Sequence, residues 1–287
     1  MPITDPRPDD ERFAGSGRIW KDSCVDEREN LERRPHRSIV SYVRRSPRMT
    51  PSQRAWMDSY APRWVIEVDH GDLATSVAPQ PFLDCEAIYG RSAPLIVEIG
   101  SGHGDTLLAG ATRHPELNFL GFEVFEASIA ATLGKLAANG VENVRLVCAD
   151  AVSGLSHLVP DHSISEIWVF FPDPWQKKRH HKRRLISPDF ADLAHAKLVP
   201  SGILRMATDW ESYAEHMSDV LGGDGRFELI GTDRFATRPV TKFESRGLEA
   251  GREIHDFAYR VRQSDTDPAT GRMTLKSETT RDDRTLS

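Results

Sequence analysis

Short apolar runs alternate with helical patterns between residues 90 and 263, and this alternation constrains the fold more than any other feature. The runs at 95–100, 118–124, 144–150, 164–173 and 202–209 predict buried strands, each followed by a helical pattern. Two more strands are predicted at 226–231 and 254–262. This order favours an α/β fold with a doubly wound, mostly parallel sheet of about seven strands. Helices should cover both faces, and ligands should bind at the carboxyl ends of the strands.

Local signals set some boundaries. Ser187 followed by Pro188 predicts the start of the helix before the 202–209 strand, and Gly140 predicts the end of an earlier one. Residues 1–35 and 264–287 lack apolar periodicity and are expected to be disordered. Residues 36–89 are expected to form a basic extension that packs on the main domain, which spans 90–263.

Positive charge is concentrated in two places although the net charge is −6. Residues 28–54 contain eight arginines against two glutamates, and all eight residues at 177–184 are Lys, Arg or His. Such local patches fit a polyanionic partner that touches part of the surface. The alternative is a solvated basic tail together with a run that resembles a nuclear-import signal.

The chain carries no signal for a membrane, a disulfide framework or a metal site. No apolar run approaches the ~20 residues that span a bilayer, and the amino terminus lacks the features of a signal peptide. We therefore expect a cytoplasmic protein with no membrane partner. Cys24, Cys85 and Cys148 are scattered without metal-ligand spacing, which favours reduced thiols.

A glycine-rich loop, E-I-G-S-G-H-G, follows the first predicted strand. Gly100, Gly102 and Gly104 allow a sharp turn and a close approach to a ligand. Such turns serve NAD, FAD and S-adenosylmethionine, or no ligand at all. The G-x-G-x-G spacing differs from the pattern that seats a pyrophosphate, and Glu98 suits the ammonium and sulfonium of S-adenosylmethionine.

Two more carboxylates end the next two predicted strands. Glu123 lies about twenty residues beyond the glycines, where an acid can accept hydrogen bonds from ribose hydroxyls. Asp150 ends the following strand, within expected reach of an adenine amino group. Each could be a solvated acid, but the series favours a cofactor site.

These motifs, with F-P-D-P-W, K-R-R, A-T-D-W and T-K-F-E in this order, resemble those of the bacterial tRNA (guanine-N7-)-methyltransferases. The resemblance covers about residues 37–262. It implies a Rossmann-like, class I methyltransferase that uses S-adenosylmethionine to methylate N7 of the variable-loop guanine at position 46 of tRNA. It also implies that the cofactor site includes Glu98, Glu123, Asp150 and Asp173, and that substrate guanosine meets Lys177, Asp209, Thr241, Lys242, Phe243 and Glu244.

The stretch after the fourth main strand contains a candidate catalytic residue followed by candidate tRNA-binding residues. Pro172 and Pro174 restrict the turn that carries Asp173, and Trp175 offers a flat face near a base unless it is a core aromatic. Beyond it, the side chains expected to hold tRNA phosphates include Arg179, Lys182, Arg183 and Arg184. Relatives commonly have His where this chain has Gln176, so no imidazole role is expected there.

The expected chemistry needs neither a metal nor a general base, because guanine N7 carries a lone pair and no proton. Catalysis should come from alignment and from carboxylate stabilisation of the charge that develops on the purine. Asp173 is the expected catalytic residue. Asp173, Asp209 and Glu244 are candidates to accept the guanine N1 and N2 protons.

Two rival functions remain open at this stage. Adenine-N6 methyltransferases also use an acid or amide, prolines and an aromatic after the fourth strand, but with two adjacent prolines, whereas one proline separates Asp173 from Trp175 here. A non-catalytic RNA-binding protein would explain the basic patches but not the glycine loop and acids. The sequence allows a monomer or a homodimer.

Overall fold

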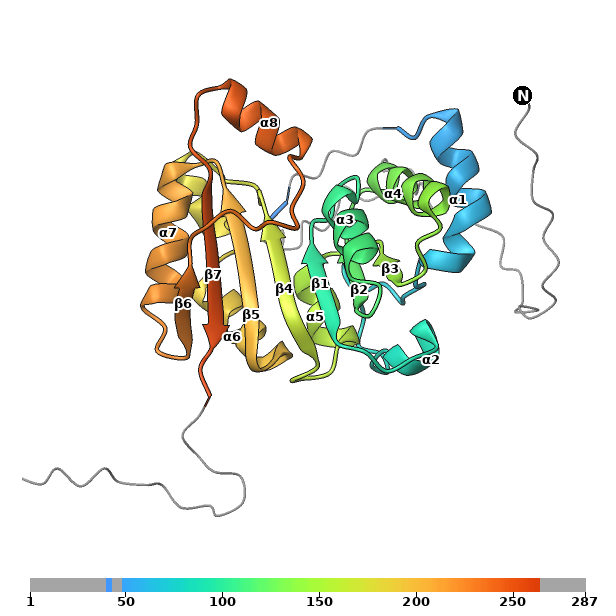
Figure 1. Cartoon of the computed structure of the whole chain (residues 1–287), viewed down its shortest axis with the longest axis horizontal. Coiled ribbons are helices and arrows are strands. Elements are labelled where there is room, and N and C mark those ends of the chain that lie inside the picture. The colour runs from blue at the N-terminus through green and yellow to red at the C-terminus, as the bar shows by residue number, and fades with distance from the viewer. Residues whose placement is uncertain (1–39, 43–47, 264–287) are drawn as a thin grey trace, which may run out of the picture. The chain divides into compact units, whose positions relative to one another are not determined.

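The computed structural model describes residues 40–42 and 48–263, which belong to one compact unit. The ends predicted to be disordered, 1–35 and 264–287, lie outside the described residues, as do 36–39 and 43–47. Seven strands form one sheet in the order β3-β2-β1-β4-β5-β7-β6 (Figure 1). They are β1 (Leu95–Ile99), β2 (Asn118–Phe122), β3 (Val144–Val147), β4 (Ile164–Phe170), β5 (Leu198–Thr208), β6 (Phe227–Gly231) and β7 (His255–Val261). The predicted α/β sheet is confirmed.

Strand direction determines which segments meet at one edge of the sheet. The five strands from β3 to β5 are mutually parallel, whereas β7 runs antiparallel to both β5 and β6. The carboxyl end of β6 and the amino end of β7 therefore lie at the same edge as the carboxyl ends of the parallel strands. Helix α8 (Lys242–Glu249), in the connection between β6 and β7, is thereby delivered to the edge where ligands bind in such sheets.

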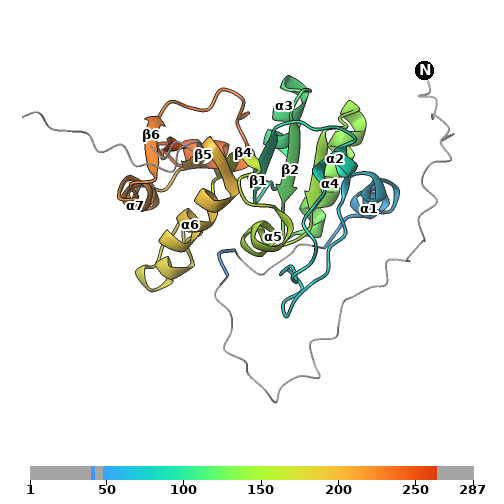
Figure 2. The ribbon, with the colours of Figure 1, turned by 90° about the horizontal axis from the view of Figure 1, so that it is seen from below.

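Helices cover both faces, and the alternation of side chains along β1 shows why. Leu95, Val97 and Ile99 pack in one core with α5 (Ala151–Leu158), α6 (Pro188–Lys197) and α7 (Glu211–Gly222). Ile96 faces the other core, with α1 (Pro51–Trp64), α3 (Asp105–Arg113) and α4 (Glu126–Asn139). Figure 2 shows α5, α6 and α7 along one side of the sheet and α3 on the other.

The predicted helix boundaries at Ser187 and Gly140 are confirmed. The Ser187 hydroxyl accepts a hydrogen bond from the Phe190 amide at 3.2 Å, and Gly140 ends α4 with φ of 61°. Four elements were not predicted: α1, α2 (Cys85–Tyr89), the 3₁₀ helix η1 (Lys178–Arg183) and α8. Helix α1 begins with a capping box between Thr50 and Gln53 and packs on α4.

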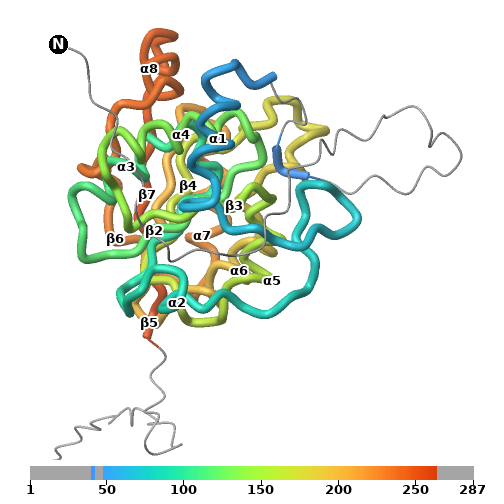
Figure 3. The backbone as a smooth tube through the Cα atoms, turned by 90° about the vertical axis from the view of Figure 1, so that its right-hand side faces the viewer, coloured from blue at the N-terminus to red at the C-terminus, as the bar shows by residue number. Residues whose placement is uncertain are grey.

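Helix α8 projects beyond the sheet at the end that carries the ligand-binding edge, in both Figure 1 and Figure 3. Across residues 40–42 and 48–263, no helix is long and apolar enough to cross a membrane.

Candidate active site

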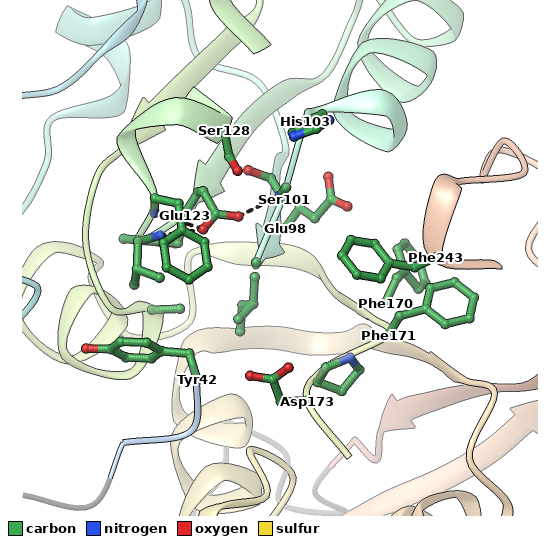
Figure 4. A pocket seen from close by; sticks show the side chains of 18 of the residues that line it. Tyr42, Glu98, Ser101, His103, Glu123, Ser128, Phe170, Phe171, Asp173 and Phe243 are labelled. Atoms are coloured by element: carbon green, nitrogen blue, oxygen red, sulfur yellow. Dashed lines mark hydrogen bonds between the residues drawn. The ribbon is translucent and has the colours of Figure 1, made fainter. Parts of the chain in front are cut away.

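A cavity of about 410 Å³ opens at the carboxyl ends of the parallel strands. Its walls come from the glycine loop, from the ends of β2, β3 and β4, from the first turns of α8, and from Ser41 and Tyr42 ahead of α1. Figure 4 shows Glu98, Glu123 and Asp173 around this space, with Phe243 on the same side of the view as Phe170 and Phe171. All four acids predicted for the cofactor site line the cavity, including Asp150.

The glycine loop needs its glycines for backbone conformation and for space. Gly100, Gly102 and Gly104 have φ of 69°, 54° and 72°, in the left-handed region that disfavours other residues. A Cβ on Gly104 would also lie 2.3 Å from Cγ2 of Thr132. The loop can therefore approach a ligand and pack against α4 only with glycine at this position.

Glu123 holds the glycine loop as well as facing the cavity. Its carboxylate accepts hydrogen bonds from the amides of Gly102 at 2.8 Å, Val124 at 2.7 Å and Phe125 at 3.0 Å. Burial raises the pKa of this carboxyl, and the three amides oppose that shift. The side chain is thus fixed in place on the cavity wall at the end of β2.

Glu98 is buried beneath the loop without full hydrogen bonding. Burial, together with the nearby Asp105 and Glu123, raises its pKa to about 8. Within the described residues, its Oε2 atom has no hydrogen-bond partner, and neither does the Ser101 hydroxyl. A buried carboxylate oxygen left without a partner beside a cavity is suited to a cationic ligand, since an ammonium would supply both charge and hydrogen bonds.

Asp150 caps α5 at the end of β3. Its Oδ1 accepts the Ser153 amide at 3.0 Å, and its own amide donates to the Thr75 carbonyl at 2.6 Å. Burial raises the pKa of the carboxyl. Thr75 also bonds to the Tyr42 hydroxyl, so the wall near Asp150 is tied to the segment ahead of α1.

Asp173 sits in a turn whose two flanking aromatics have unusual backbone conformations. Phe171 and Trp175 have φ of 53° and 45°, which for bulky residues costs roughly 1–3 kcal/mol each. Pro172 and Pro174 restrict the residues between them. This turn leaves β4 and brings the Asp173 carboxylate to the cavity wall. Strain of this kind persists only where surrounding contacts hold it.

Comparisons with known proteins agree with this geometry. A family model described as a putative methyltransferase matches residues 92–257. A tRNA (guanine-N(7)-)-methyltransferase of Cutibacterium acnes is 49% identical over 79% of this chain and 84% of its own length. Enzymes of the same name from Nocardioides sp. and Pseudomonas paraeruginosa are 43% and 42% identical over 79% and 80% of this chain, and over 88% and 93% of their own lengths.

The chain belongs to the tRNA (guanine-N(7)-)-methyltransferase family. Among solved structures, the 16S rRNA methyltransferase KamB covers 64% of this chain and 96% of its own, with 16% identity and a TM-score of 0.48.

Of the residues that the family resemblance assigns to guanosine, three line the cavity and three do not. Thr241, Lys242 and Phe243 lie on the wall at the start of α8, where the Thr241 hydroxyl accepts the Glu244 amide at 3.3 Å. Lys177 is exposed outside the cavity wall. Asp209 and Glu244 are engaged in ion pairs with arginines away from the wall.

Trp175 packs against other parts of the chain. Its ring nitrogen donates to the Ser41 carbonyl at 2.8 Å, and the Arg183 guanidinium lies 4.8 Å from the ring centre. The ring is absent from the cavity wall. It instead joins the turn to the segment ahead of α1 and to η1.

The side chains of the basic run at 177–184 differ in how far they are buried. Arg179 and Lys182 on η1 are exposed, and Arg183 is half-buried over Trp175. Arg184 is buried, with a relative exposure of 5%. It donates to the carbonyls of Pro174 at 3.1 Å and Ser212 at 2.9 Å, and to the Ser212 hydroxyl at 3.1 Å. The Arg184 guanidinium is therefore used inside the protein, which argues against the expected contact with a tRNA phosphate.

The sequence interpretation missed several wall residues. Arg246 lies one turn after Lys242 on α8, and it would have been found if this segment had been predicted as a helix. Tyr42 reaches the cavity from a segment to which the sequence interpretation assigned no site residue. In the part of the chain that the structure describes, no cluster of three or more His, Cys, Asp or Glu side chains could hold a metal ion.

Proposed function

We propose that this protein transfers the methyl group of S-adenosylmethionine to N7 of guanine in tRNA, at the variable-loop guanine of position 46, in the cytoplasm. The observation that carries the proposal is 49% identity over 79% of the chain to a protein named for this activity. A cavity with a glycine loop and four acids, close to exposed basic side chains, supports it.

The residues of the cavity fit S-adenosylmethionine. The volume of about 410 Å³ falls in the usual range of roughly 300–1,000 Å³ for small-ligand sites. Glu98 would bind the ammonium group through its unpartnered oxygen, Glu123 the ribose hydroxyls and Asp150 the adenine amino group. When bound there, the cofactor supplies a methyl group on a positively charged sulfur.

Asp173 carries the catalytic role in this proposal. Guanine N7 has no proton to lose, so the carboxylate serves to align the base and to stabilise the positive charge that develops on it. Of the three acids considered for the guanine N1 and N2 protons, Asp173 alone lines the cavity. The turn that holds it is fixed by Arg184 and by the packing of Trp175, which keeps the carboxylate preorganised.

The exposed cations of the basic run would hold the tRNA backbone. Lys177, Arg179 and Lys182 follow the Asp173 turn directly, and all three side chains are exposed to solvent. Phosphate contacts of this kind supply affinity and register. The protein is predicted to act as a monomer or a homodimer.

The test is to incubate the purified protein with an unmodified tRNA transcript and S-adenosylmethionine labelled in its methyl group, and to identify the methylated nucleoside. We expect N7-methylguanosine, and a transcript with another base at position 46 should yield none. Recovery of N6-methyladenosine, or no methylated nucleoside, rejects the proposal. Binding of the labelled cofactor without transfer would indicate a different acceptor.

A further inference from the structure

The loop at residues 69–78, between α1 and α2, is closed by its own backbone. The Ala78 amide donates to the Asp69 carbonyl at 2.8 Å, and an isolated antiparallel bridge pairs His70 with Val77. The loop lies outside the seven-stranded sheet, yet this pairing gives it a defined shape. It can therefore hold another part of the chain in place.

The second half of this loop, residues 75–77, is bonded to the start of α5. The Thr75 carbonyl accepts the Asp150 amide at 2.6 Å, and the Val77 amide donates to the Ser153 hydroxyl at 3.1 Å. The Ser153 hydroxyl in turn donates to the Asp150 carbonyl at 3.1 Å. Val77 is 3% exposed and packs in the same core as α5. Neither Thr75 nor Ser153 lines the cavity, so each acts on a ligand there only through other residues.

The Asp150 carboxylate contacts both this support and the cavity. Its Oδ1 accepts the Ser153 amide at 3.0 Å, and the residue lines the wall. Burial raises the pKa of the carboxyl, and the amide and hydroxyl of Ser153 oppose that shift because they favour the ionised form. An ionised carboxylate that is fixed in direction selects a ligand that offers a hydrogen-bond donor over one that offers an acceptor.

Thr75 supports a second residue of the cavity wall as well. Its hydroxyl is hydrogen-bonded to the Tyr42 hydroxyl, and Tyr42 and Asp150 both line the cavity. The backbone of Thr75 therefore holds one wall residue and its side chain holds another. Loss of either link should loosen the wall at this end of the cavity.

We propose that the 69–78 loop fixes Asp150 so that the site selects the adenine base of the cofactor, and that Thr75 and Ser153 are the positioning residues of this selection. Asp150 accepts a hydrogen bond from the amino group of adenine. A purine with a carbonyl oxygen in place of that amino group presents an acceptor to the carboxylate and is rejected, because neither oxygen is then satisfied. The inference rests on the proposed use of S-adenosylmethionine.

The test compares the binding of two ligands that differ only in the base. They are S-adenosylhomocysteine, which remains after methyl transfer, and S-inosylhomocysteine, in which hypoxanthine replaces adenine. The ribose and amino acid parts are shared, so the ratio of the two Kd values, measured by calorimetry, reports the contacts to the base. We expect the parent to prefer adenine on the order of 10²-fold. A smaller folded fraction weakens both ligands equally, so a loss of stability alone leaves the ratio unchanged.

Ser153→Ala removes the hydroxyl that joins the loop to Asp150. The preference for adenine should fall on the order of 10-fold, because the Kd for S-adenosylhomocysteine rises while that for S-inosylhomocysteine changes little. Ser153→Thr keeps a hydroxyl and should retain the parent ratio. The matched control is Ser156→Ala on the same helix, where the hydroxyl is exposed and donates to the Val152 carbonyl. An unchanged ratio in Ser153→Ala, or an equal weakening of both ligands, overturns the proposal.

Thr75→Val tests the second link independently of Ser153. It keeps the shape of the side chain and the carbonyl that accepts the Asp150 amide, but it removes the hydrogen bond to Tyr42. The preference for adenine should fall a few-fold, and Thr75→Ser, which keeps the hydroxyl, should not change it. A parent-like ratio in Thr75→Val overturns the role of the Thr75 side chain.

The outcomes for the parent separate this inference from the proposed function. A parent that makes N7-methylguanosine but binds both ligands equally overturns the inference and leaves the function standing. A parent that prefers adenine but methylates another nucleotide overturns the function alone. A parent that binds neither ligand overturns both.

Discussion

The two halves of the cavity are built in different ways. The cofactor half, around β1 to β3, is made by strand ends, glycines and backbone amides: Glu123 is held by three amides and Asp150 by one at the start of a helix. The substrate half, around β4 and α8, is held by arginines that connect distant segments: Arg184, Arg238 and Arg252. The difference indicates that the first half is specified locally in the sequence, and the second by tertiary contacts.

The largest effect should come from the substrate half, at Asp173. Asp173→Asn keeps the shape and an accepting oxygen but loses the charge, so single-turnover methylation should fall on the order of 10²–10³-fold. Because N7 needs no deprotonation, neither higher pH nor small added bases should restore the rate. A circular dichroism spectrum like that of the parent serves as the folding control. Chemical rescue by base would contradict electrostatic catalysis, and unchanged turnover would remove Asp173 from the site.

The next largest effect is expected from a substitution of Arg184. It tests whether buried arginines stabilise the substrate half of the cavity. Arg184→Ala removes four hydrogen bonds, to Pro174, Ser212 and His181, from a buried position, so the free energy of unfolding should fall by roughly 2–3 kcal/mol. Turnover should fall with it, because the Pro174 carbonyl next to Asp173 loses its donor. Denaturant unfolding measures the change in stability, and single-turnover methylation measures the change in turnover. Binding of tRNA over a range of salt concentrations shows whether a phosphate contact is lost. A parent-like unfolding midpoint with a flatter salt dependence would restore the phosphate-binding role.

The cofactor half is tested at Glu98, whose pKa is raised. Replacing it should weaken cofactor binding but stabilise the protein without cofactor. Glu98→Gln removes the charge for the cofactor's ammonium, so affinity for S-adenosylmethionine at pH 8 should fall on the order of 10- to 100-fold. The parent should also release a proton on binding at pH 7, because a carboxyl with a pKa of about 8 becomes ionised beside a cation. Calorimetry in two buffers of different ionisation enthalpy measures that proton. Equal proton release from Glu98→Gln would assign it to another group.

The same variant should stabilise the protein without cofactor. A folded-state pKa raised from the ordinary 4.5 to about 8 means that the protonated carboxyl stabilises the fold at low pH, and that this contribution is lost as pH rises through that interval. The glutamine side chain does not ionise, so Glu98→Gln should raise the unfolding temperature above pH 8 and change it little below pH 4.5. A pH-independent difference would contradict the raised pKa.

The cofactor half of the cavity could be predicted from the sequence better than the substrate half. The order of strands and helices, the glycine loop and the acids at 98, 123 and 150 were predicted, because periodicity and strand-end position are local signals. Arg184 was assigned to the surface because it ends a basic run, and burial depends on Ser212 and Tyr213, which lie about thirty residues away. The position of α8 likewise depends on Arg238 and Asp256, whose pairing has no sequence pattern. Helix α1 has clear caps but little amphipathic periodicity, which is why it was missed.

The smallest effect should appear at Lys182, and it completes the contrast with Arg184 two positions later. Lys182 is exposed on η1, so Lys182→Ala should leave the fold, the affinity for S-adenosylmethionine and kcat close to those of the parent. Binding of tRNA should weaken a few-fold, and the slope of log affinity against log salt should become shallower by about 0.9, the value for one phosphate contact. Filter binding of tRNA at several salt concentrations measures this slope for Lys182→Ala, Arg184→Ala and the parent. If only Lys182→Ala changes the slope, exposed cations bind the RNA and the buried arginine holds the site. If both change it equally, the division of the basic run by burial is wrong.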